Sequence, residues 1–356
     1  EHFLEEAASQ RYVGHADFSH VSLISMDPGF MKSMVKDETS GELLQLKSIS
    51  KTTVFRSAHN HRRAVDERLM LELGTANPLL SQLRYAFQGK DKVYLATELS
   101  EAGNLDYFIS TNGILSEDQG RYLLAQVIIG LEFVHAHGFV HRNIRMSSIM
   151  LAQSGHVRLG GFDYCLQISS QKALNAELTD LPLSALPCLD LEYGVSLDLW
   201  MLGILTVEIL HGMVPTSGFN VDEFLRDTKN TLSDSAQMFL RQILSPRPET
   251  RLGCGVNGIR ELRQHEFFRD INWRGVEKRE NHQDLLWRDK VSCASLSRDM
   301  SDFAVVHEGN LTEQVEYDVF SDVTLWPLTR PSKHVVSDGV LVGWFFSRGR
   351  LTDVLR

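Results

Sequence analysis

The feature that most constrains the fold of this 356-residue chain is a change of pattern near residue 99. Before it, Glu42–Ile49 and Lys92–Leu99 have the length and apolar content of β-strands, and a helix is predicted from Arg63 to Gly74. From about residue 100 to residue 270 the pattern is helical. Strands followed by helices predict an α+β fold.

Two helices of the second part carry clear signals. Ser116 and Gln119 have the spacing of a capping box, ahead of a helix predicted to close at Gly138. Leu199–Leu210 is the most apolar run of the chain, but it is too short to span a bilayer and contains Glu208. We therefore predict that it is a buried core helix.

Composition narrows the classes of function. The formal net charge of −10 argues against nucleic acid as the main partner. The four cysteines form no CxxC pair, which argues against a zinc ribbon and fits a reducing compartment. We expect an intracellular protein, cytoplasmic or nuclear, with no signal peptide and no transmembrane segment.

Two short polar strips stand out in the helical part: His141-Arg142-Asn143 and Gly161-Phe162-Asp163. They resemble the His-Arg-Asp and Asp-Phe-Gly strips of protein kinases, with the acids displaced. Further segments resemble that family in the same order: a lysine-bearing strand at 38–51, an αC-to-hinge segment at 65–99, an αF-like helix at 196–210 and an AGC-type segment at 245–273.

The whole order is similar to serine/threonine kinases of the AGC group, which includes the cyclic-AMP-dependent kinase. This resemblance implies a two-lobed protein-kinase-like fold, with a small β-rich N-lobe and a large helical C-lobe. It implies an N-terminal extension at 1–14, the N-lobe at 15–99, the C-lobe at 100–272 and an AGC-type C-terminal tail at 273–356.

Phosphoryl transfer in this family needs a base, magnesium ligands, a phosphate cradle and a lysine. The resemblance places Asn143 at the base position and Ser148 and Gly161 at the two metal-ligand positions. An amide cannot act as a carboxylate base, a lone hydroxyl is a weak magnesium ligand, and glycine has no side chain. We therefore predict no intact catalytic residue, no metal site and no cofactor, which puts ATP and magnesium in doubt.

Asp163 leaves an alternative open, because it lies two residues after Gly161. A local rearrangement could bring it to the lost metal-ligand position. The other interpretation is that Asp163 is a solvated or capping carboxylate, and this is the one we favour.

The positions that would form the nucleotide pocket are altered as well. Ser25–Phe30 aligns with the glycine-rich cradle, but only Gly29 is present, out of register. Gln45 and Lys32 fall at apolar positions of the pocket, where long polar side chains are expected to fill it. Thr97 falls at the gatekeeper position.

Other family positions keep workable residues. Lys47 and Glu67 match the strand lysine and the αC glutamate, and their pair either locks the helix to the sheet or keeps a residual nucleotide contact. His141 and Phe162 match the hydrophobic spine, with Asp198 as its anchor. These residues indicate a retained fold rather than a retained activity.

Glu177 falls where the family carries a phosphorylated threonine, and Arg142 matches the arginine that grips that phosphate. Our hypothesis is that the two pair and hold the activation segment without phosphorylation; the alternative is that Glu177 is exposed. Arg251 has Cys188 where its acid partner is expected, so it must find another acid or remain at the surface.

The C-terminal stretch GWFFS, Gly343–Ser347, loosely resembles the aromatic motif of AGC tails. In that family the motif docks close to the segment before the αC helix, which here is His59–Val65. Docking of this chain's tail there is a hypothesis.

The sequence thus predicts a catalytically inactive, kinase-like protein that acts as a scaffold or allosteric partner of a signalling protein, such as an active kinase. One alternative is a serine/threonine kinase with residual non-standard ATP-dependent activity that uses Lys47, Glu67 and Asp163. Another is a nucleotide-binding sensor that transfers no phosphate.

Overall fold

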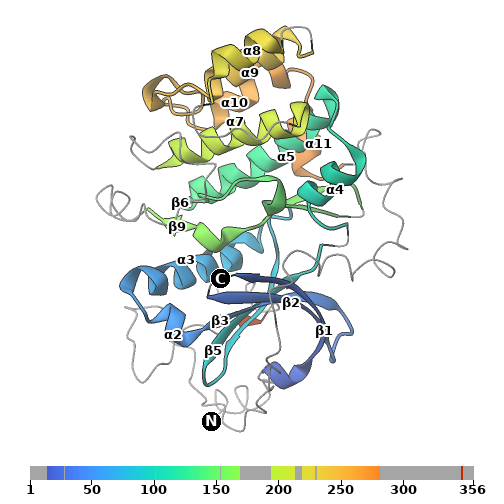
Figure 1. Ribbon diagram of the computed structural model, residues 1–356, viewed down its shortest axis with the longest axis vertical. Helices are drawn as coiled ribbons and strands as arrows, with labels where there is room; N and C mark the ends of the chain where they lie inside the picture. The colour runs from blue at the N-terminus through green and yellow to red at the C-terminus, as the bar shows by residue number, and fades with distance from the viewer. Residues whose placement is uncertain are drawn as a thin grey trace. The chain divides into compact units, whose positions relative to one another are not determined.

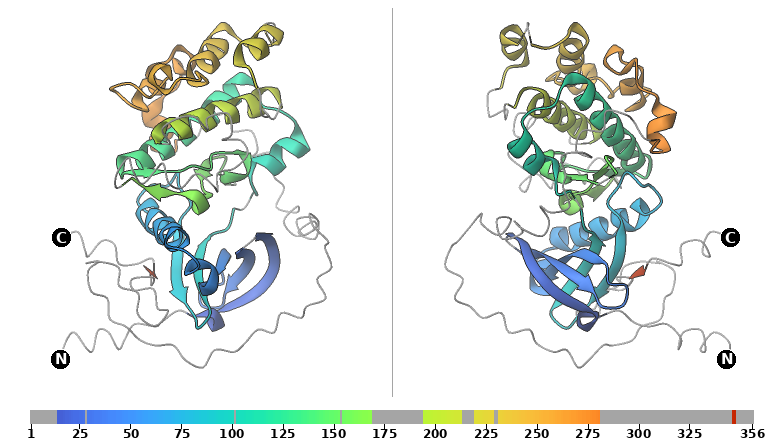
Figure 2. Two further views of the ribbon diagram at one scale, coloured as in Figure 1. Left: turned by 60° about the vertical axis from the view of Figure 1, so that its left-hand side comes forward. Right: turned by 90° about the vertical axis from the view of Figure 1, so that its right-hand side faces the viewer.

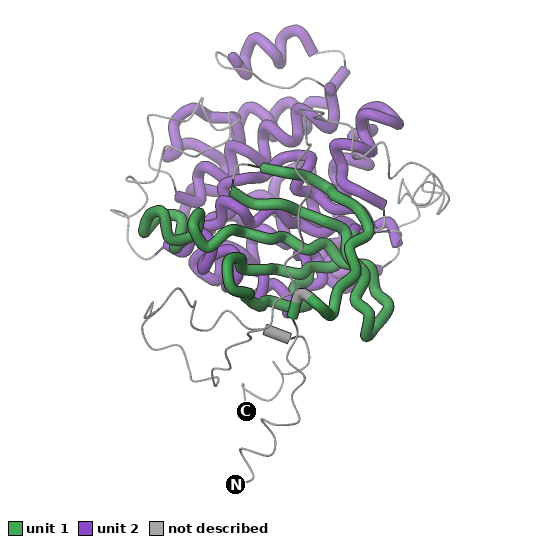
Figure 3. The backbone as a smooth tube through the Cα atoms, turned by 60° about the horizontal axis from the view of Figure 1, so that its bottom comes forward, with its two compact units in different colours: residues 1–61, 82–99, 294–356 green, residues 62–81, 100–293 purple. Residues whose placement is uncertain are grey.

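The computed structural model describes residues 14–27, 29–100, 102–152, 154–168, 194–212, 219–228, 231–280 and 346–347. The chain divides into two compact units (Figure 3). The first unit contains residues 1–61, 82–99 and 294–356, and the second contains residues 62–81 and 100–293.

The first unit is built on an antiparallel sheet with the strand order β1-β2-β3-β5-β4-β10 (Figure 1). Its strands are β1 (Phe18–Asp27), β2 (Phe30–Asp37), β3 (Leu43–Ser50), β4 (Leu83–Gln88), β5 (Lys92–Glu98) and β10 (Phe346–Ser347). The short helices η1 (His15–Asp17) and α2 (Lys51–Val54) flank β1 and β3 in the chain.

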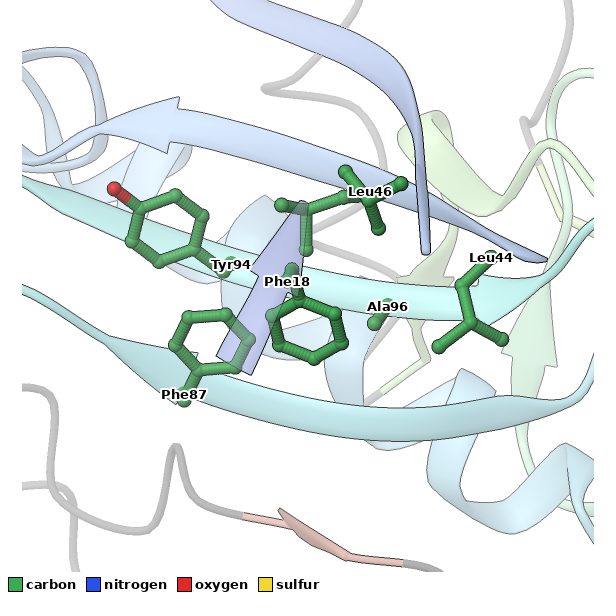
Figure 4. Packing of buried hydrophobic residues seen from close by; sticks show 7 residues of the cluster. Phe18, Leu44, Leu46, Phe87, Tyr94 and Ala96 are labelled. Carbon is green, nitrogen blue, oxygen red and sulfur yellow. The ribbon is translucent and has the colours of Figure 1, made fainter. Parts of the chain in front are cut away.

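One face of this sheet is an apolar cluster (Figure 4). The Phe87 ring stacks on Phe18 with centroids 5.6 Å apart and on Tyr94 with centroids 4.8 Å apart. Each large side chain buried in this way stabilises the fold by about 1.5–3 kcal/mol. Leu46 belongs to this face and Lys47 is its neighbour in β3, so alternation along the strand assigns Lys47 to the opposite face.

The second unit is mainly helical. Its helices are α4 (Leu105–Asn112), α5 (Glu117–Ala136), α7 (Val195–His211), α8 (Val221–Asp227), α9 (Asp234–Ile243), α10 (Arg260–Gln264) and α11 (Trp273–Glu277), with the short turns η2 (Met146–Ser148), η3 (Phe162–Tyr164), η6 (Pro248–Thr250) and η7 (Glu266–Phe268). The second unit also contains two short antiparallel strand pairs: β6 (Phe139–Val140) with β9 (Leu166–Gln167), and β7 (Ile149–Leu151) with β8 (Val157–Leu159).

Helix α3 (Ala58–Gly74) ends at the predicted glycine but begins before the predicted start, Arg63. Ser57 explains the early start, because its Oγ accepts a hydrogen bond from Asn60 N at 3.1 Å and its carbonyl accepts one from His61 N. A serine hydroxyl that satisfies the first free N–H groups favours helix initiation at that point.

The two helices predicted with clear signals are confirmed. The capping box of Ser116 and Gln119 is formed at the start of α5, and Gly138, just after its end, has φ +74°. Helix α7 is buried from Leu197 to Leu210. Together with the sheet of the first unit, these helices confirm the predicted α+β architecture.

Within the described part of the chain, none of the helices is both long enough and apolar enough to cross a membrane.

Candidate functional site

One network of hydrogen bonds in the second unit centres on the carboxylate of Asp198, in the first turn of α7. It is fully buried and accepts hydrogen bonds from His141 N (2.8 Å), Arg142 N (2.7 Å) and His135 Nε2 (2.8 Å). Burial alone would raise the pKa of Asp198, but these hydrogen bonds and the nearby imidazoles hold it below its ordinary value. We call Asp198, His135, His141 and Arg142 the loop frame.

The loop frame holds a strained backbone. Arg142 has φ +63°, a left-handed conformation that costs a non-glycine residue about 1–2 kcal/mol. The His141 ring continues the frame toward the second strip, because its Nε2 donates to the Gly160 carbonyl at 2.8 Å and its ring lies 4.9 Å from that of Phe162. The predicted anchor role of Asp198 therefore has a geometric basis in its contacts.

The three positions expected to carry the chemistry, Asn143, Ser148 and Gly161, lie together in the second unit. Asn143 Nδ2 donates to the Gly161 carbonyl at 3.2 Å. Ser148 Oγ donates to the Arg145 carbonyl at 2.7 Å and accepts from Arg145 N at 3.0 Å, which ties it into the turn η2. We call these three residues the chemistry positions.

Gly161 lies in close contact with Ser148, which limits the space for a side chain at position 161. Its φ is +74°, and a Cβ added to it would lie 2.8 Å from Ser148 Cβ and 3.5 Å from Asn143 Nδ2. Real Cβ atoms do not approach carbon that closely, so a side chain at position 161 requires Ser148 to shift.

The donors at the chemistry positions do not fit a magnesium ion. They are one amide, one hydroxyl already used in its own turn, and a glycine, whereas magnesium is bound through carboxylates and phosphates. Among the described residues there is no group of three or more His, Cys, Asp or Glu side chains that could hold a metal. We derive no catalytic step through magnesium.

Asp163 is 8% exposed, so the expectation that it is solvated is wrong. It lies in the first turn of η3, where a carboxylate is favoured by the partial positive charge of a helix start. Its charge also counteracts the burial that lowers the pKa of His141. Whether it replaces a metal ligand stays a prediction.

Helix α3 is fastened to the segment that follows Gly161. Arg63 donates to the Asp163 carbonyl from Nη2 at 3.0 Å and lies 4.5 Å from the centre of the Tyr164 ring. Arg62 Nη2 donates to the Gln167 carbonyl, and Asp66 Oδ2 accepts from Gln167 N at 3.1 Å. We call this set the α3 clasp; sequence reasoning missed it because its partners are backbone groups about 100 residues away.

The first unit carries its own predicted positions, on the lysine-bearing face of its sheet. Lys32 is directly opposite Lys47 in the β2–β3 register, and Gln45 lies between Met34 and Thr97 across the neighbouring strands. Since paired residues share a face, all five side chains belong to the face opposite the apolar cluster. The prediction that Gln45 and Lys32 fill a nucleotide pocket stays a prediction.

A tight turn stands where the cradle was expected. Asp27 pairs with Phe30, so only two residues separate β1 from β2. Gly29 has φ +102°, and a Cβ on it would lie 2.8 Å from Thr53 Cγ2 of α2. The hairpin therefore packs closely on α2 at Gly29, and the expected loss of the phosphate cradle stays a prediction.

The Phe30 ring is the part of this face that sequence reasoning missed. Lys47 Nζ lies 4.2 Å from its centroid, and Lys32 Nζ lies 5.3 Å from it. Phe30 falls at the last position of the aligned cradle, which is the only signal in the sequence that could have indicated it.

Two predicted pairs are not tested. Lys47 is 5% exposed in the first unit and Glu67 is 6% exposed in the second, and each is described only within its own unit. Glu177 lies outside the described residues, so its pairing with Arg142 also stays a prediction.

Arg251 corrects an expectation. It is 2% exposed rather than at the surface, and it donates to the carbonyls of Ser245 (3.0 Å), Ser196 (2.6 Å) and Pro246 (3.2 Å). Its guanidinium also lies 5.1 Å from the Trp200 ring centre. Backbone carbonyls are good acceptors for the planar fork of an arginine, so they help to hold this buried charge, and the expectation that Arg251 finds another acid stays a prediction.

The last two residues of the C-terminal motif pair with an edge strand. Phe346 and Ser347 form β10, which pairs antiparallel with Ala86 and Tyr85 of β4 (Figure 2, red strand). An edge strand offers free N–H and C=O groups for this pairing. Contact of the motif with His59–Val65 stays a prediction.

Comparison with known proteins gives a family match and curated relatives. The family model described as "Protein kinase domain" matches residues 31–268. RAC-beta serine/threonine-protein kinase A of Xenopus laevis is 28% identical over 275 residues, covering 74% of this chain and 56% of that protein. The human RAC-beta serine/threonine-protein kinase is 27% identical over 272 residues, covering 73% and 56%.

Protein kinase C epsilon type of Oryctolagus cuniculus is 30% identical over 224 residues, which are 60% of this chain and 30% of that protein. The chain thus spans just over half the length of the RAC-beta proteins it matches. These matches confirm the two-lobed fold prediction and support the AGC-type resemblance. The particular likeness to the cyclic-AMP-dependent kinase and the loss of activity stay predictions.

Proposed function

The chain belongs to the protein kinase domain family, and we propose that within it this protein is catalytically inactive and works by binding another protein. The observation that carries the proposal is the contact among the chemistry positions. Asn143, Ser148 and Gly161 bond one another or their own turn and supply no carboxylate. A base and two metal ligands are missing together, and no single change restores them all.

The α3 clasp supports the binding part of the proposal. It uses arginine and aspartate side chains on backbone groups, with one cation–π contact, and so it needs no phosphate group. A helix held in this way presents a constant surface, whereas a regulated kinase orders the corresponding segment by phosphorylation. We propose that this surface contacts a protein partner of a signalling pathway inside the cell, and that nucleic acid is not a partner.

A melting-temperature titration separates this proposal from its two alternatives. A ligand that binds only the folded state must raise the melting temperature by mass action. We expect no shift with ATP at about 1 mM, with or without magnesium. A shift that requires magnesium favours residual kinase activity, and a shift without magnesium favours a nucleotide sensor.

The binding role is tested by quantitative affinity capture from cells with the double variant Arg62→Ala/Arg63→Ala. We expect this variant to lose a specific protein that the unmodified chain retains. The matched control is Arg260→Ala/Arg269→Ala, which removes two exposed arginines elsewhere in the same unit. Equal capture by both variants would count against the α3 clasp as the contact surface.

A further inference from the structure

The first unit places an aromatic ring directly on its buried lysine. Lys47 Nζ lies 4.2 Å from the Phe30 ring centroid, and the Lys32 ammonium faces the same ring at 5.3 Å. A cation this close to the face of a ring is attracted by the ring's quadrupole, and more strongly where water is excluded. Lys47 is only 5% exposed, so water screens this attraction weakly.

The position of the ring is fixed by the backbone around it. The Asp27–Phe30 pair makes the hairpin turn two residues long, and Phe30 is also paired with Ile49 of β3. Gly29 packs on Thr53, and the Thr53 carbonyl accepts a hydrogen bond from Asn60 Nδ2 at 2.9 Å. The ring is therefore held at both its strand and its turn.

Two lysines opposite one another on adjacent strands repel each other, which favours an electron-rich group between them. A polyphosphate anion would meet that requirement, and so does the face of an aromatic ring. The ring and the anion would compete for the same ammonium groups.

We propose that the Phe30 ring covers Lys47 on the lysine-bearing face and thereby excludes polyphosphate anions. Removing the ring is expected to let these anions bind there. The inference rests on the proposed function, because it gives a physical reason for the expected lack of nucleotide binding in a family member that keeps its strand lysine. It makes Phe30, rather than the predicted pocket-filling residues Gln45 and Lys32, the residue that determines exclusion.

The experiment measures binding of ATP and of inorganic tripolyphosphate, both without magnesium, to the unmodified chain and to Phe30→Ala. We expect affinity of the variant for both probes to rise about tenfold or more, the size of effect that corresponds to one strong cation–π contact. The gain should disappear in Phe30→Ala/Lys47→Met. Met31→Ala is the matched control, because Met31 is the next residue of β2 and alternation assigns it to the opposite face.

Phe30→Leu keeps the inference testable if Phe30→Ala does not fold, as judged by circular dichroism. It removes the ring while keeping an apolar side chain, and a smaller gain for both probes is expected. Unchanged binding in a folded Phe30 variant would overturn the inference, and so would an equal gain in Met31→Ala or a gain that survives Lys47→Met. These outcomes leave the proposed function standing; transfer of phosphate by the unmodified chain would overturn the proposed function instead.

Discussion

The loop frame and the chemistry positions meet at Arg142 and Asn143, which are neighbours in the chain, yet the hydrogen bonding of the two sets differs sharply. Asp198 in the frame accepts three hydrogen bonds from His135, His141 and Arg142, at 2.7–2.8 Å. At the chemistry positions, Asn143 donates one long bond of 3.2 Å, and its Oδ1 is buried with no hydrogen-bond partner. The difference indicates that the conformation of this loop is set by its frame, whose hydrogen bonds do not use the side chains of the chemistry positions.

The largest expected effect comes from the frame itself. Asp198→Asn keeps the shape of the side chain but removes the charge that holds two backbone N–H groups and the strained Arg142. We expect a loss of about 3–5 kcal/mol in unfolding free energy, the usual cost of breaking a buried charged network. Asn143→Ala, measured alongside by denaturant unfolding, should cost about 1–2 kcal/mol. Equal losses would abolish the distinction between frame and chemistry positions.

The second prediction compares the two buried acids of α7. Asp198 has a lowered pKa, whereas burial raises the pKa of Glu208 to about 7, helped by Asp106 and opposed by Arg145. The ordinary pKa of a glutamate side chain is 4.5, and this value applies to the unfolded chain. Between pH 4.5 and pH 7, the folded protein therefore keeps a proton on Glu208 that the unfolded chain has lost. The free energy of unfolding should fall by about 3 kcal/mol across this window because of Glu208.

The measurement is the free energy of unfolding of the unmodified chain and of Glu208→Gln, obtained by denaturant unfolding at several pH values. The difference between the two proteins at each pH isolates the contribution of Glu208. This comparison is needed because burial lowers the pKa of His156 to about 4. The contribution of His156 to the free energy of unfolding therefore rises with pH over nearly the same range, in the opposite direction to that of Glu208. Asp198 does not interfere, since its contribution is lost only below pH 3.8. Parallel pH profiles for the two proteins would show that Glu208 does not titrate as described.

A third test concerns Arg251, a retained arginine at whose expected acid partner's position Cys188 stands. Arg251→Met leaves the carbonyls of Ser245, Ser196 and Pro246 without their donor, and we expect a loss of about 2–3 kcal/mol. Arg260→Met is the control, because Arg260 is 76% exposed and should contribute little. The two stabilities are compared by urea unfolding, and a negligible loss for Arg251→Met would show that its hydrogen bonds to these carbonyls do not stabilise the fold.

The smallest effect concerns Gly161. Gly161→Ala should cost about 1–2 kcal/mol for its left-handed backbone, with an added steric cost against Ser148. In a Ser148→Gly background the steric part should disappear and the backbone part remain. Thermal unfolding of the four proteins gives this coupling directly, and complete additivity would contradict the contact described at Ser148.

Sequence reasoning was strongest where signals are local. The capping box of α5 and the apolar run of α7 each depend on residues that are close together in the sequence, and both helices are confirmed. The order of the kinase-like segments predicted the fold, and the two strips aligned Asn143, Ser148 and Gly161.

What the sequence did not reveal depends on contacts between distant residues. Burial of Asp163 and Arg251 arises from how the chain packs around them, and a charged residue type by itself predicts exposure. The α3 clasp joins side chains to carbonyl and N–H groups, which every residue type carries. The Phe30 ring acts through the β2–β3 register, which a single sequence does not specify.

The most direct test of the central claim is transfer of radiolabelled phosphate from ATP to the chain itself and to a general protein acceptor, with magnesium or manganese. The Lys47→Met variant defines the background. The account predicts that the unmodified chain gives no label above that background. Label that appears with the unmodified chain and vanishes in Lys47→Met would contradict it.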